Sequence, residues 1–519
     1  MVTGDFSRKS PPCHSKPPVI PRKVHLYPTQ LKQVTQSWLS IVQLLLLGLL
    51  CHQGDAAPTQ LTRAHFTPRH HPLQLGVTFL RAADGKELFS IDSKTPMISA
   101  STTKLLTSIA ALDHFGTGYS FDTVAYTDGK RQGNTLHGNL IIQGAGDPHL
   151  VNEELYEFSR QIYSTGIHTV TGDLIVDQDK FQTPSGNSLR PHTSKSSSHA
   201  YDAKVTAFAT NFNTYSIHIQ PGKVGKRAHA QLYPFALKRV RIKHNIHTHA
   251  HRTQLKASRT QLRDGGVEIL VRGTISATDG PQFLYRSMGD PAWGAADTLR
   301  SHLEHAGVTI SGKTRLGSKT PNASPLLTFN GKPVSQLVQS LNRYSNNFIA
   351  DTLVHALGVQ NHRSTTPSTF QRGLSTLNLF LTQKAKLPLQ QPILSGSGLN
   401  PRNKIDAHSL ALLLSYASQR WDIFPEFLAS LPISGVSGTL KDRFDSSITH
   451  MLRGKVRAKT GTLTSPVMVS TLAGYLHTDK HGLVAFAILQ NGNPQKPSTP
   501  ISELHRSQEK GLAAAYRWL

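Results

Sequence analysis

Cysteine is nearly absent from this sequence. The 519 residues contain two cysteines, Cys13 and Cys51, and both precede residue 57. The rest of the chain therefore has no disulfide framework, no thiol nucleophile and no cysteine-based zinc site. Covalent catalysis in that part of the chain would need a different nucleophile.

Acidic residues are also scarce. The chain has 31 Asp and Glu against 56 Lys and Arg, which gives a formal net charge of +25. No acidic residue occurs between Asp202 and Asp264, whereas twelve Lys and Arg and six His occupy that stretch. This balance favours polyanionic partners such as nucleic acid, acidic lipid or an anionic cell-wall polymer. Charge alone does not choose among the three.

Apolar runs long enough to span a bilayer are absent. The strongest candidate, residues 38–51, has 14 mostly apolar residues, which is short for a membrane span. It follows a basic segment and precedes the small residues Ala56 and Ala57, which is the pattern of a secretory signal. We therefore predict that residues 1–56 are a leader and that the protein is exported to the periplasm. An uncleaved anchor is the alternative, because Pro58 lies close to the expected cleavage site.

Apolar periodicity divides the chain into three parts. Strand patterns at 77–82 and 87–91 flank a turn, and a helical pattern follows at 101–115. Short strand patterns dominate the middle, and the C-terminal part returns to helices and ends in strands, at 295–305, 347–357, 409–416, 467–476 and 483–489. We predict an α/β (α+β) catalytic domain from residues 57–125 and 285–519, interrupted by β-rich domains at 126–284.

The first candidate for chemistry is an S-x-x-K tetrad, Ser101-Thr102-Thr103-Lys104, at the start of the predicted helix. The i, i+3 spacing places both side chains on one helix face, so that a neutral Lys104 could activate Ser101 as a nucleophile. Alone, the tetrad is more typical of a capping serine beside a solvated lysine.

Two further motifs change that interpretation. Ser345-Asn346-Asn347 gives S-x-N, and Lys459-Thr460-Gly461 gives K-T-G, followed by Thr462. The order S-x-x-K, S-x-N, K-T-G is that of serine acyltransferases that act on D-amino-acid amides and β-lactams. Taken alone, K-T-G would be read as a turn at a strand end.

With these motifs the chain resembles the class C low-molecular-mass penicillin-binding proteins, the serine D-Ala-D-Ala carboxypeptidase/endopeptidase family with a domain insertion. The resemblance covers most of residues 60–519 and includes the stretches around Asp147 and Gly396-Ser397-Gly398-Leu399. Three residues depart from the family pattern: Ser395, Asn400 and Asn346. The resemblance implies a penicillin-recognising serine transpeptidase-like fold with β-rich domains between the first two motifs.

The resemblance also implies a role for each motif residue. Ser101 attacks the carbonyl carbon between two D-residues, Lys104 accepts its proton, and Ser345 relays a proton to the leaving amine. Burial beside Lys459 would favour the neutral form of Lys104 through desolvation and like-charge repulsion. The backbone N–H groups of Ser101 and Thr462 would hold the oxyanion. The predicted substrate-binding residues are Asn347, Lys459, Thr460, Gly461, Thr462 and, as a minor possibility beside a plain turn role, Asp147.

Two further sequence features limit the chemistry. No E-x-x-L-N box follows Ser101, so no glutamate base for deacylation is visible, which implies a long-lived acyl-enzyme with penicillin.

His247, His249 and His251 alternate as they would on one strand face, which could suit a divalent metal but is more typical of an exposed basic strand. We predict no metal and no cofactor.

These observations predict an exported serine-type D-Ala-D-Ala carboxypeptidase or endopeptidase. Its substrates would be peptidoglycan stem peptides or cross-links, and β-lactam antibiotics would acylate it. A non-catalytic wall-binding or regulatory protein of the same fold is the alternative. Nucleic acid is not an expected partner, because no recognised binding motif accompanies the charge. Electrostatic association with an anionic wall polymer or a membrane surface is compatible with that charge.

Overall fold

The structure is a computed structural model that describes residues 60–68, 73–182, 197–359, 367–495 and 499–519. The predicted leader and both cysteines lie outside these residues. Among the residues described, no helix is both long and apolar enough to cross a bilayer.

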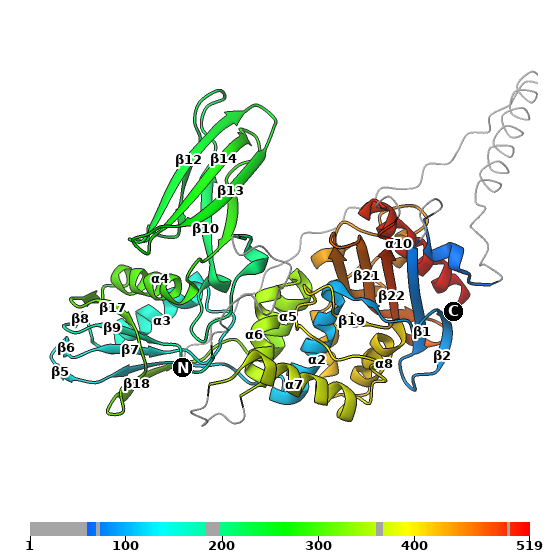
Figure 1. Ribbon diagram of the computed structural model, residues 1–519, viewed down its shortest axis with the longest axis horizontal. Helices are drawn as coiled ribbons and strands as arrows, with labels where there is room; N and C mark the ends of the chain where they lie inside the picture. The colour runs from blue at the N-terminus through cyan, green and yellow to red at the C-terminus, as the bar shows by residue number, and fades with distance from the viewer. Residues whose placement is uncertain (1–59, 69–72, 183–196, 360–366, 496–498) are drawn as a thin grey trace, which may run out of the picture. The chain divides into compact units, whose positions relative to one another are not determined.

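Strands from the two ends of the described chain form one antiparallel five-stranded sheet in the order β2-β1-β22-β21-β20 (Figure 1). Their bounds are Leu73–Arg81 (β1), Glu87–Ile91 (β2), Val456–Leu463 (β20), Val469–Thr478 (β21) and Gly482–Gly492 (β22). The predicted hairpin is confirmed by the pairing of Val77 with Ile91. Because β20 is an edge strand, its outer edge is not paired with another strand of this sheet, although Ile433 forms an isolated bridge with Arg457 there.

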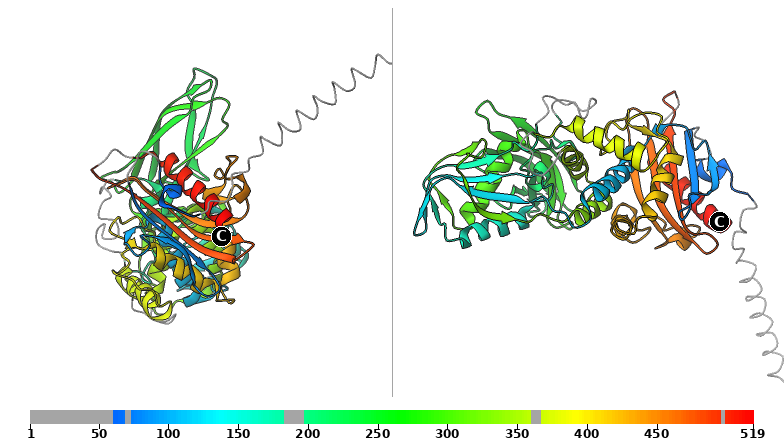
Figure 2. Two further views of the ribbon diagram at one scale, coloured as in Figure 1. Left: turned by 90° about the vertical axis from the view of Figure 1, so that its right-hand side faces the viewer. Right: turned by 90° about the horizontal axis from the view of Figure 1, so that it is seen from below.

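Alternation along β21 and β22 buries both faces of this sheet. Leu472 and Ile488 face helix α10 (Ile501–Trp518), whereas Ala473 and Ala487 face helix α8 (Ala407–Ser418). Figure 2 shows α10, in red, against the strands. Beyond α8 lies a group of helices around α2 (Lys104–Phe115), whose Leu105, Ile109 and Leu112 are fully buried. The group comprises α5 (Val334–Tyr344), α6 (Asn347–Leu357), α7 (Phe370–Leu379) and α9 (Phe424–Ser430).

The middle of the chain contributes two further sheets packed with helices. The first has the order β17-β9-β7-β4-β18 and the second β16-β8-β6-β5. Their bounds are Thr123–Thr127 (β4), Lys130–Gln132 (β5), Thr135–His137 (β6), Leu140–Gln143 (β7), Thr169–Val170 (β8), Leu174–Asp177 (β9), Thr309–Ile310 (β16), Thr314–Leu316 (β17) and Ser324–Phe329 (β18). Helices α3 (Asn152–Ser164) and α4 (Pro291–His305) share their apolar core.

The sequence-based boundaries of the insertion need correction. The return of helical periodicity places the helix of 295–305 in the catalytic domain, but α4 packs with α3, and β18 pairs with β4. Strand β4 itself begins at Thr123. The inserted sheets therefore extend from Thr123 to Phe329, because strand pairing, which periodicity does not report, closes the sheet with late strands.

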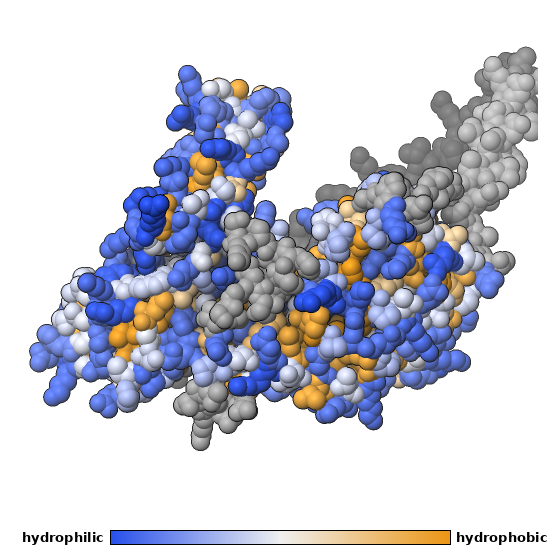
Figure 3. Space-filling view, viewed as in Figure 1, coloured by the Kyte–Doolittle hydropathy of each residue, from blue (hydrophilic) through white to orange (hydrophobic). Residues whose placement is uncertain are grey.

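A small β-sandwich forms within this insertion from two three-stranded sheets, β11-β10-β15 and β12-β14-β13. Their bounds are Thr214–Gln220 (β10), His229–Tyr233 (β11), Val240–His249 (β12), Gln254–Gln261 (β13), Val267–Ser276 (β14) and Gln282–Ser287 (β15). Ile217, Ile219, Ile246 and Ile269 are fully buried between the sheets. Outside this core the surface that carries β12 and β14 is largely hydrophilic (Figure 3).

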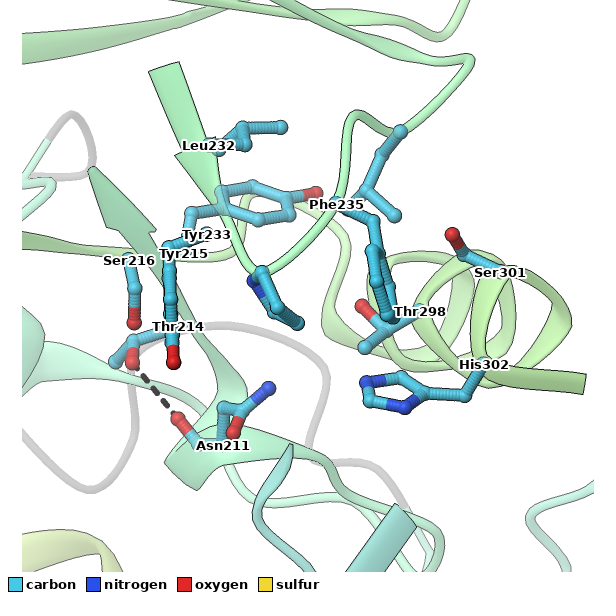
Figure 4. Close-up of a pocket in the computed structure, with 12 residues that line it drawn as sticks. Asn211, Thr214, Tyr215, Ser216, Leu232, Tyr233, Phe235, Thr298, Ser301 and His302 are labelled. Atoms are coloured by element: carbon cyan, nitrogen blue, oxygen red, sulfur yellow. Dashed lines mark hydrogen bonds between the residues drawn. The ribbon is translucent and has the colours of Figure 1, made fainter. Parts of the chain in front are cut away.

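A cavity of about 20 Å³ lies between β10, the segment after β11 and α4. Tyr215 and His302 lie on opposite sides of it (Figure 4). This volume has room for about one water molecule. Burial lowers the pKa of His302 to about 4, so the imidazole is neutral at pH 7.

Candidate active site

The predicted nucleophile sits in a tight turn, not in the α-helix itself. Ser101 belongs to the 3-10 turn η2 (Ala100–Thr103), between the short strand β3 (Met97–Ile98) and α2. Ala100, the preceding residue, has φ +46°, a left-handed conformation that costs energy for any residue with a Cβ. The carbonyl of Ser99 accepts a hydrogen bond from the Thr471 hydroxyl at 2.9 Å, which anchors the turn to β21. Ser101 is thereby held half-buried at the edge of the sheet.

Lys104 is fully buried, and three acceptors surround its Nζ. Nζ lies 2.6 Å from Oδ1 of Asn347, 2.6 Å from the carbonyl oxygen of Ser397 and 2.9 Å from Oγ of Ser101. A neutral amine has two N–H donors and one lone pair. Because the two carbonyl oxygens accept only, the lone pair of a neutral Lys104 would face the Ser101 hydroxyl. This is the geometry that proton transfer from Ser101 requires.

Ser345 and Lys459 form the second half of the site. Lys459 donates from Nζ to Oγ of Ser345 at 2.8 Å and to the carbonyl oxygen of Thr460 at 2.6 Å. Ser345 ends α5 in a left-handed conformation with φ +57°, and this turn separates α5 from α6. Burial and the charge of Lys104 together hold the pKa of Lys459 well below its usual range.

The departure at Asn346 has a structural explanation. Asn346 is the N-cap of α6, and its Oδ1 accepts a hydrogen bond from the Ile349 N–H at 3.1 Å. Asn and Asp serve equally well at this position. The cap fixes the first residue of the helix, Asn347, which is the residue that contacts Lys104.

Gly461 allows the K-T-G strand to approach the nucleophile turn. It lies inside β20 opposite Thr471, so K-T-G is not a strand-end turn. A Cβ at this position would lie 2.8 Å from the Ser101 nitrogen and 2.2 Å from the Thr471 hydroxyl oxygen. The structure gives Gly461 a packing role, and the substrate contact that the motif predicts for it stays a prediction. Thr460 is half-buried and Thr462 is exposed, so both remain available to a ligand.

Three residues at the site have no role predicted from the sequence. The carbonyl of Ser397 binds Lys104, the Thr439 hydroxyl accepts a hydrogen bond from the Thr460 hydroxyl at 2.7 Å, and the Tyr201 carbonyl lies 3.5 Å from Nδ2 of Asn347. The only sequence signal for Ser397 was the family-like stretch at 396–399. Ser395, which departs from the family pattern just before that stretch, accepts a hydrogen bond through its Oγ from the Gly398 N–H at 3.0 Å and so holds the turn.

Asp147 does not belong to this group. Its side chain is 4% exposed, and its Oδ1 accepts the His149 N–H at 2.8 Å. Burial raises the pKa of Asp147 to about 7. The structure therefore gives Asp147 the turn role that the sequence also allows, with its carboxyl group directed into the protein, and the minor possibility of a substrate contact stays a prediction.

The alternating histidines do not gather into a metal site. His247 and His249 lie on the exposed face of β12, as the basic-strand interpretation predicts. Within the described ranges, no group of three or more His, Cys, Asp or Glu side chains is placed to hold a metal ion.

Known proteins are similar to this chain over most of its length. Residues 60–510 match the D-Ala-D-Ala carboxypeptidase 3 (S13) family. Over 442 residues the chain is 28% identical to the D-alanyl-D-alanine carboxypeptidase of Actinomadura sp., with 80% of this chain and 78% of that protein covered.

Solved structures show the same fold. Penicillin binding protein 4 from Haemophilus influenzae superposes with a TM-score of 0.69 at 24% identity, covering 85% of this chain and 96% of that one. Its complex with a β-lactam gives a TM-score of 0.66 at 23% identity, with 86% and 97% covered. These matches confirm the predicted family resemblance and the predicted fold class.

Proposed function

Because the chain belongs to the D-Ala-D-Ala carboxypeptidase 3 (S13) family, we propose that it cleaves the bond after a D-alanine residue in peptidoglycan stem peptides through an acyl-enzyme on Ser101. The observation that carries the proposal is the position of the Lys104 Nζ, 2.9 Å from Oγ of Ser101 and bound to two carbonyl oxygens. The non-catalytic alternative gains no support, because every group that the reaction needs is present.

The reaction proceeds in two halves. Oγ of Ser101 attacks the carbonyl carbon as its proton passes to Lys104, and the tetrahedral oxyanion forms. The C–N bond then breaks as the leaving amine takes the proton that Lys104 received from Ser101, passed on through the Ser345 hydroxyl. The Lys459 Nζ holds that hydroxyl at 2.8 Å. Water hydrolyses the ester and restores Ser101. The predicted oxyanion donors are the backbone N–H groups of Ser101 and Thr462.

Substrate selection rests on the K-T-G strand. Lys459, Thr460 and Thr462 would bind a carboxylate on the leaving residue, which a terminal D-alanine supplies. A cross-link whose leaving amine carries a carboxylate in the same place fits the same groups. This supports both carboxypeptidase and endopeptidase action.

β-Lactams would acylate the same serine. The Haemophilus influenzae neighbour is described in complex with a β-lactam, and its fold is that of this chain. Without an E-x-x-L-N glutamate in the sequence, deacylation would lack a dedicated base and the penicilloyl-enzyme would persist.

Export and a surface association complete the proposal. The basic segment and short apolar run before residue 57 support secretion to the periplasm.

On the outward face of β12-β14-β13, Lys256 lies directly opposite Arg272. No ion pair joins either of these two to a carboxylate in the described part of the chain. An anionic wall polymer or membrane surface would relieve this like-charge repulsion.

The test is acylation by labelled penicillin followed by mass spectrometry, alongside D-alanine release from a soluble peptide that ends in D-Ala-D-Ala. Label on the peptide that contains Ser101, and its loss in Ser101→Ala, would support the proposal. Ser375→Ala, at an exposed position on α7, is the matched control and should behave as wild type. Label on another serine, or no D-alanine release, would refute it. Sequencing the N-terminus of secreted protein tests the leader.

A further inference from the structure

One outward sheet face of the small β-sandwich exposes aromatic rings. The exposed fractions of Tyr233, Phe283 and Tyr285 are 47%, 41% and 48%. Strand register places them on one face, because Tyr233 and Tyr285 both lie opposite Ser216, and Phe283 lies opposite His218. We call this set, Tyr233, Phe283, Tyr285 and His218, the aromatic face. The alternate residues of β10, Ile217 and Ile219, point inward and are fully buried, so the core does not use these rings.

The four rings form one continuous group. The ring centroids of His218 and Phe283 are 5.0 Å apart, those of Tyr233 and Phe283 are 5.4 Å apart, and those of Phe283 and Tyr285 are 6.5 Å apart. The Phe283 and Tyr285 rings are nearly parallel, at 17°. Exposed apolar groups gathered in this way on a soluble domain mark an interaction site.

The aromatic face carries no Lys, Arg, Asp or Glu, in contrast to its surroundings. Residues 214–287 contain 13 Lys and Arg and three Asp and Glu. None of these lies among the outward residues of β10, β11 and β15, where Ser216 and Gln231 accompany the rings. A face of rings and neutral hydrogen-bonding groups matches a neutral ligand that has both C–H surfaces and hydroxyl groups. Sugar rings have this character, since their C–H groups can lie against the negative face of an aromatic ring.

We propose that the aromatic face binds the glycan strand of the peptidoglycan whose stem peptides the active site cleaves, an inference that rests on the proposed function. The enzyme would then hold its polymeric substrate at two places. Such a second contact raises the effective concentration of stem peptides at Ser101 without altering the chemical step.

Other occupants fit less well. An aromatic side chain buries roughly 150–250 Å² in full, so three rings that are less than half exposed offer roughly 300 Å². A stable interface between protein chains needs about 800 Å² from each partner. An anionic lipid surface would require Lys or Arg beside the rings, and the outward residues of β10, β11 and β15 include neither. A short run of sugar rings is the occupant that matches both the area and the charge.

The experiment is co-sedimentation with purified sacculi, with the full chain carrying Ser101→Ala so that the wall is not degraded. Two wall preparations are used: intact sacculi, and sacculi from which an amidase has removed the stem peptides. Phe283→Ala with Tyr285→Ala tests the face. Tyr156→Ala with Trp421→Ala is the matched control, because these aromatic residues are 59% and 83% exposed elsewhere. Tyr285→Phe keeps the ring and should keep binding.

We expect the tested pair to bind peptide-free sacculi about tenfold more weakly than the control pair. The loss should persist in about 0.5 M salt, which screens the contribution of the lysines and arginines. The inference is overturned if both pairs bind alike, if removal of the stem peptides abolishes binding, or if the tested pair instead abolishes self-association seen by ultracentrifugation. When the two pairs of substitutions are made in the chain that retains Ser101, both variants should release D-alanine from a soluble peptide at the wild-type rate. Absence of that release from wild type would refute the proposed function alone.

Discussion

Burial lowers the pKa of Lys459 and the charge of Lys104 lowers it further, although the two lysines have different hydrogen-bond partners. Lys104 contacts Ser101, Asn347 and the Ser397 carbonyl, whereas Lys459 contacts Ser345 and the Thr460 carbonyl. Two buried ammonium groups that repel each other favour a state in which one of them is neutral. We expect Lys104 to be the neutral one during acylation, because its Nζ lies 2.9 Å from the Ser101 hydroxyl that the reaction deprotonates, whereas Lys459 contacts the Ser345 hydroxyl and is placed to bind a carboxylate.

The first prediction separates the two lysines. Lys104→Arg should lower the acylation rate constant with penicillin by about 10²-fold to about 10⁴-fold, because a guanidinium cannot accept a proton near neutral pH. Lys459→Arg keeps a cation for the substrate carboxylate and should retain part of the rate. The measurement is the acylation rate constant of both variants and wild type between about pH 5 and about pH 10. An equal or smaller loss in Lys104→Arg would show that Lys104 is not the base.

The second prediction concerns the cap of α6. Asn346→Ala should destabilise the protein by about 1 kcal/mol, because the Ile349 N–H loses its acceptor. Acylation should also slow, since the freed helix end carries Asn347. Asn346→Asp, which gives the S-D-N form of the motif, should retain both stability and rate. Calorimetric midpoints and acylation rates test this, and a stable, fully active Asn346→Ala would contradict it.

The third prediction follows from the close approach at Gly461. Gly461→Ala would place a methyl group 2.8 Å from the Ser101 nitrogen, so β20 or the nucleophile turn must shift. We expect a destabilisation of roughly 1–3 kcal/mol. The acylation rate should fall at least tenfold, because a displacement of about 1 Å has effects of this size. Gly118→Ala is the control, since no atom lies within 4 Å of its added Cβ. Unchanged acylation in Gly461→Ala would mean that the turn tolerates displacement.

Local motifs predicted the catalytic groups, because each motif fixes side chains through short-range geometry. Ser101 and Lys104 are three residues apart, and that spacing brings Nζ to Oγ in a 3-10 turn as well as in an α-helix. The Ser397 carbonyl could not be identified in this way, since any residue type supplies a carbonyl. The role of Gly461 depends on β21 and the Ser99 turn, which are distant in sequence. The insertion boundary at Phe329 depends on strand pairing with β4, which no local periodicity reports.

The last prediction concerns Asp147 and the pH dependence of stability. Burial raises its pKa from 3.8 to about 7 in the folded protein, while the unfolded chain keeps a value near 3.9. Between these values the native state binds a proton that the unfolded state has lost, so stability falls as the pH rises through this window and levels off above it. In this window the free energy of unfolding falls by at most about 1.4 kcal/mol for each pH unit.

Asp147→Asn has the shape of the protonated carboxyl group and does not titrate. The unfolding midpoint of the variant should therefore rise relative to wild type as the pH increases from about 4 to about 7, and the difference should then stay constant. Scanning calorimetry of both proteins across this range measures it. The subtraction removes contributions from groups common to both, such as Asp297, whose pKa burial raises to about 6. A difference that is independent of pH, or that shrinks toward neutrality, would show that the folded protein holds Asp147 as a carboxylate.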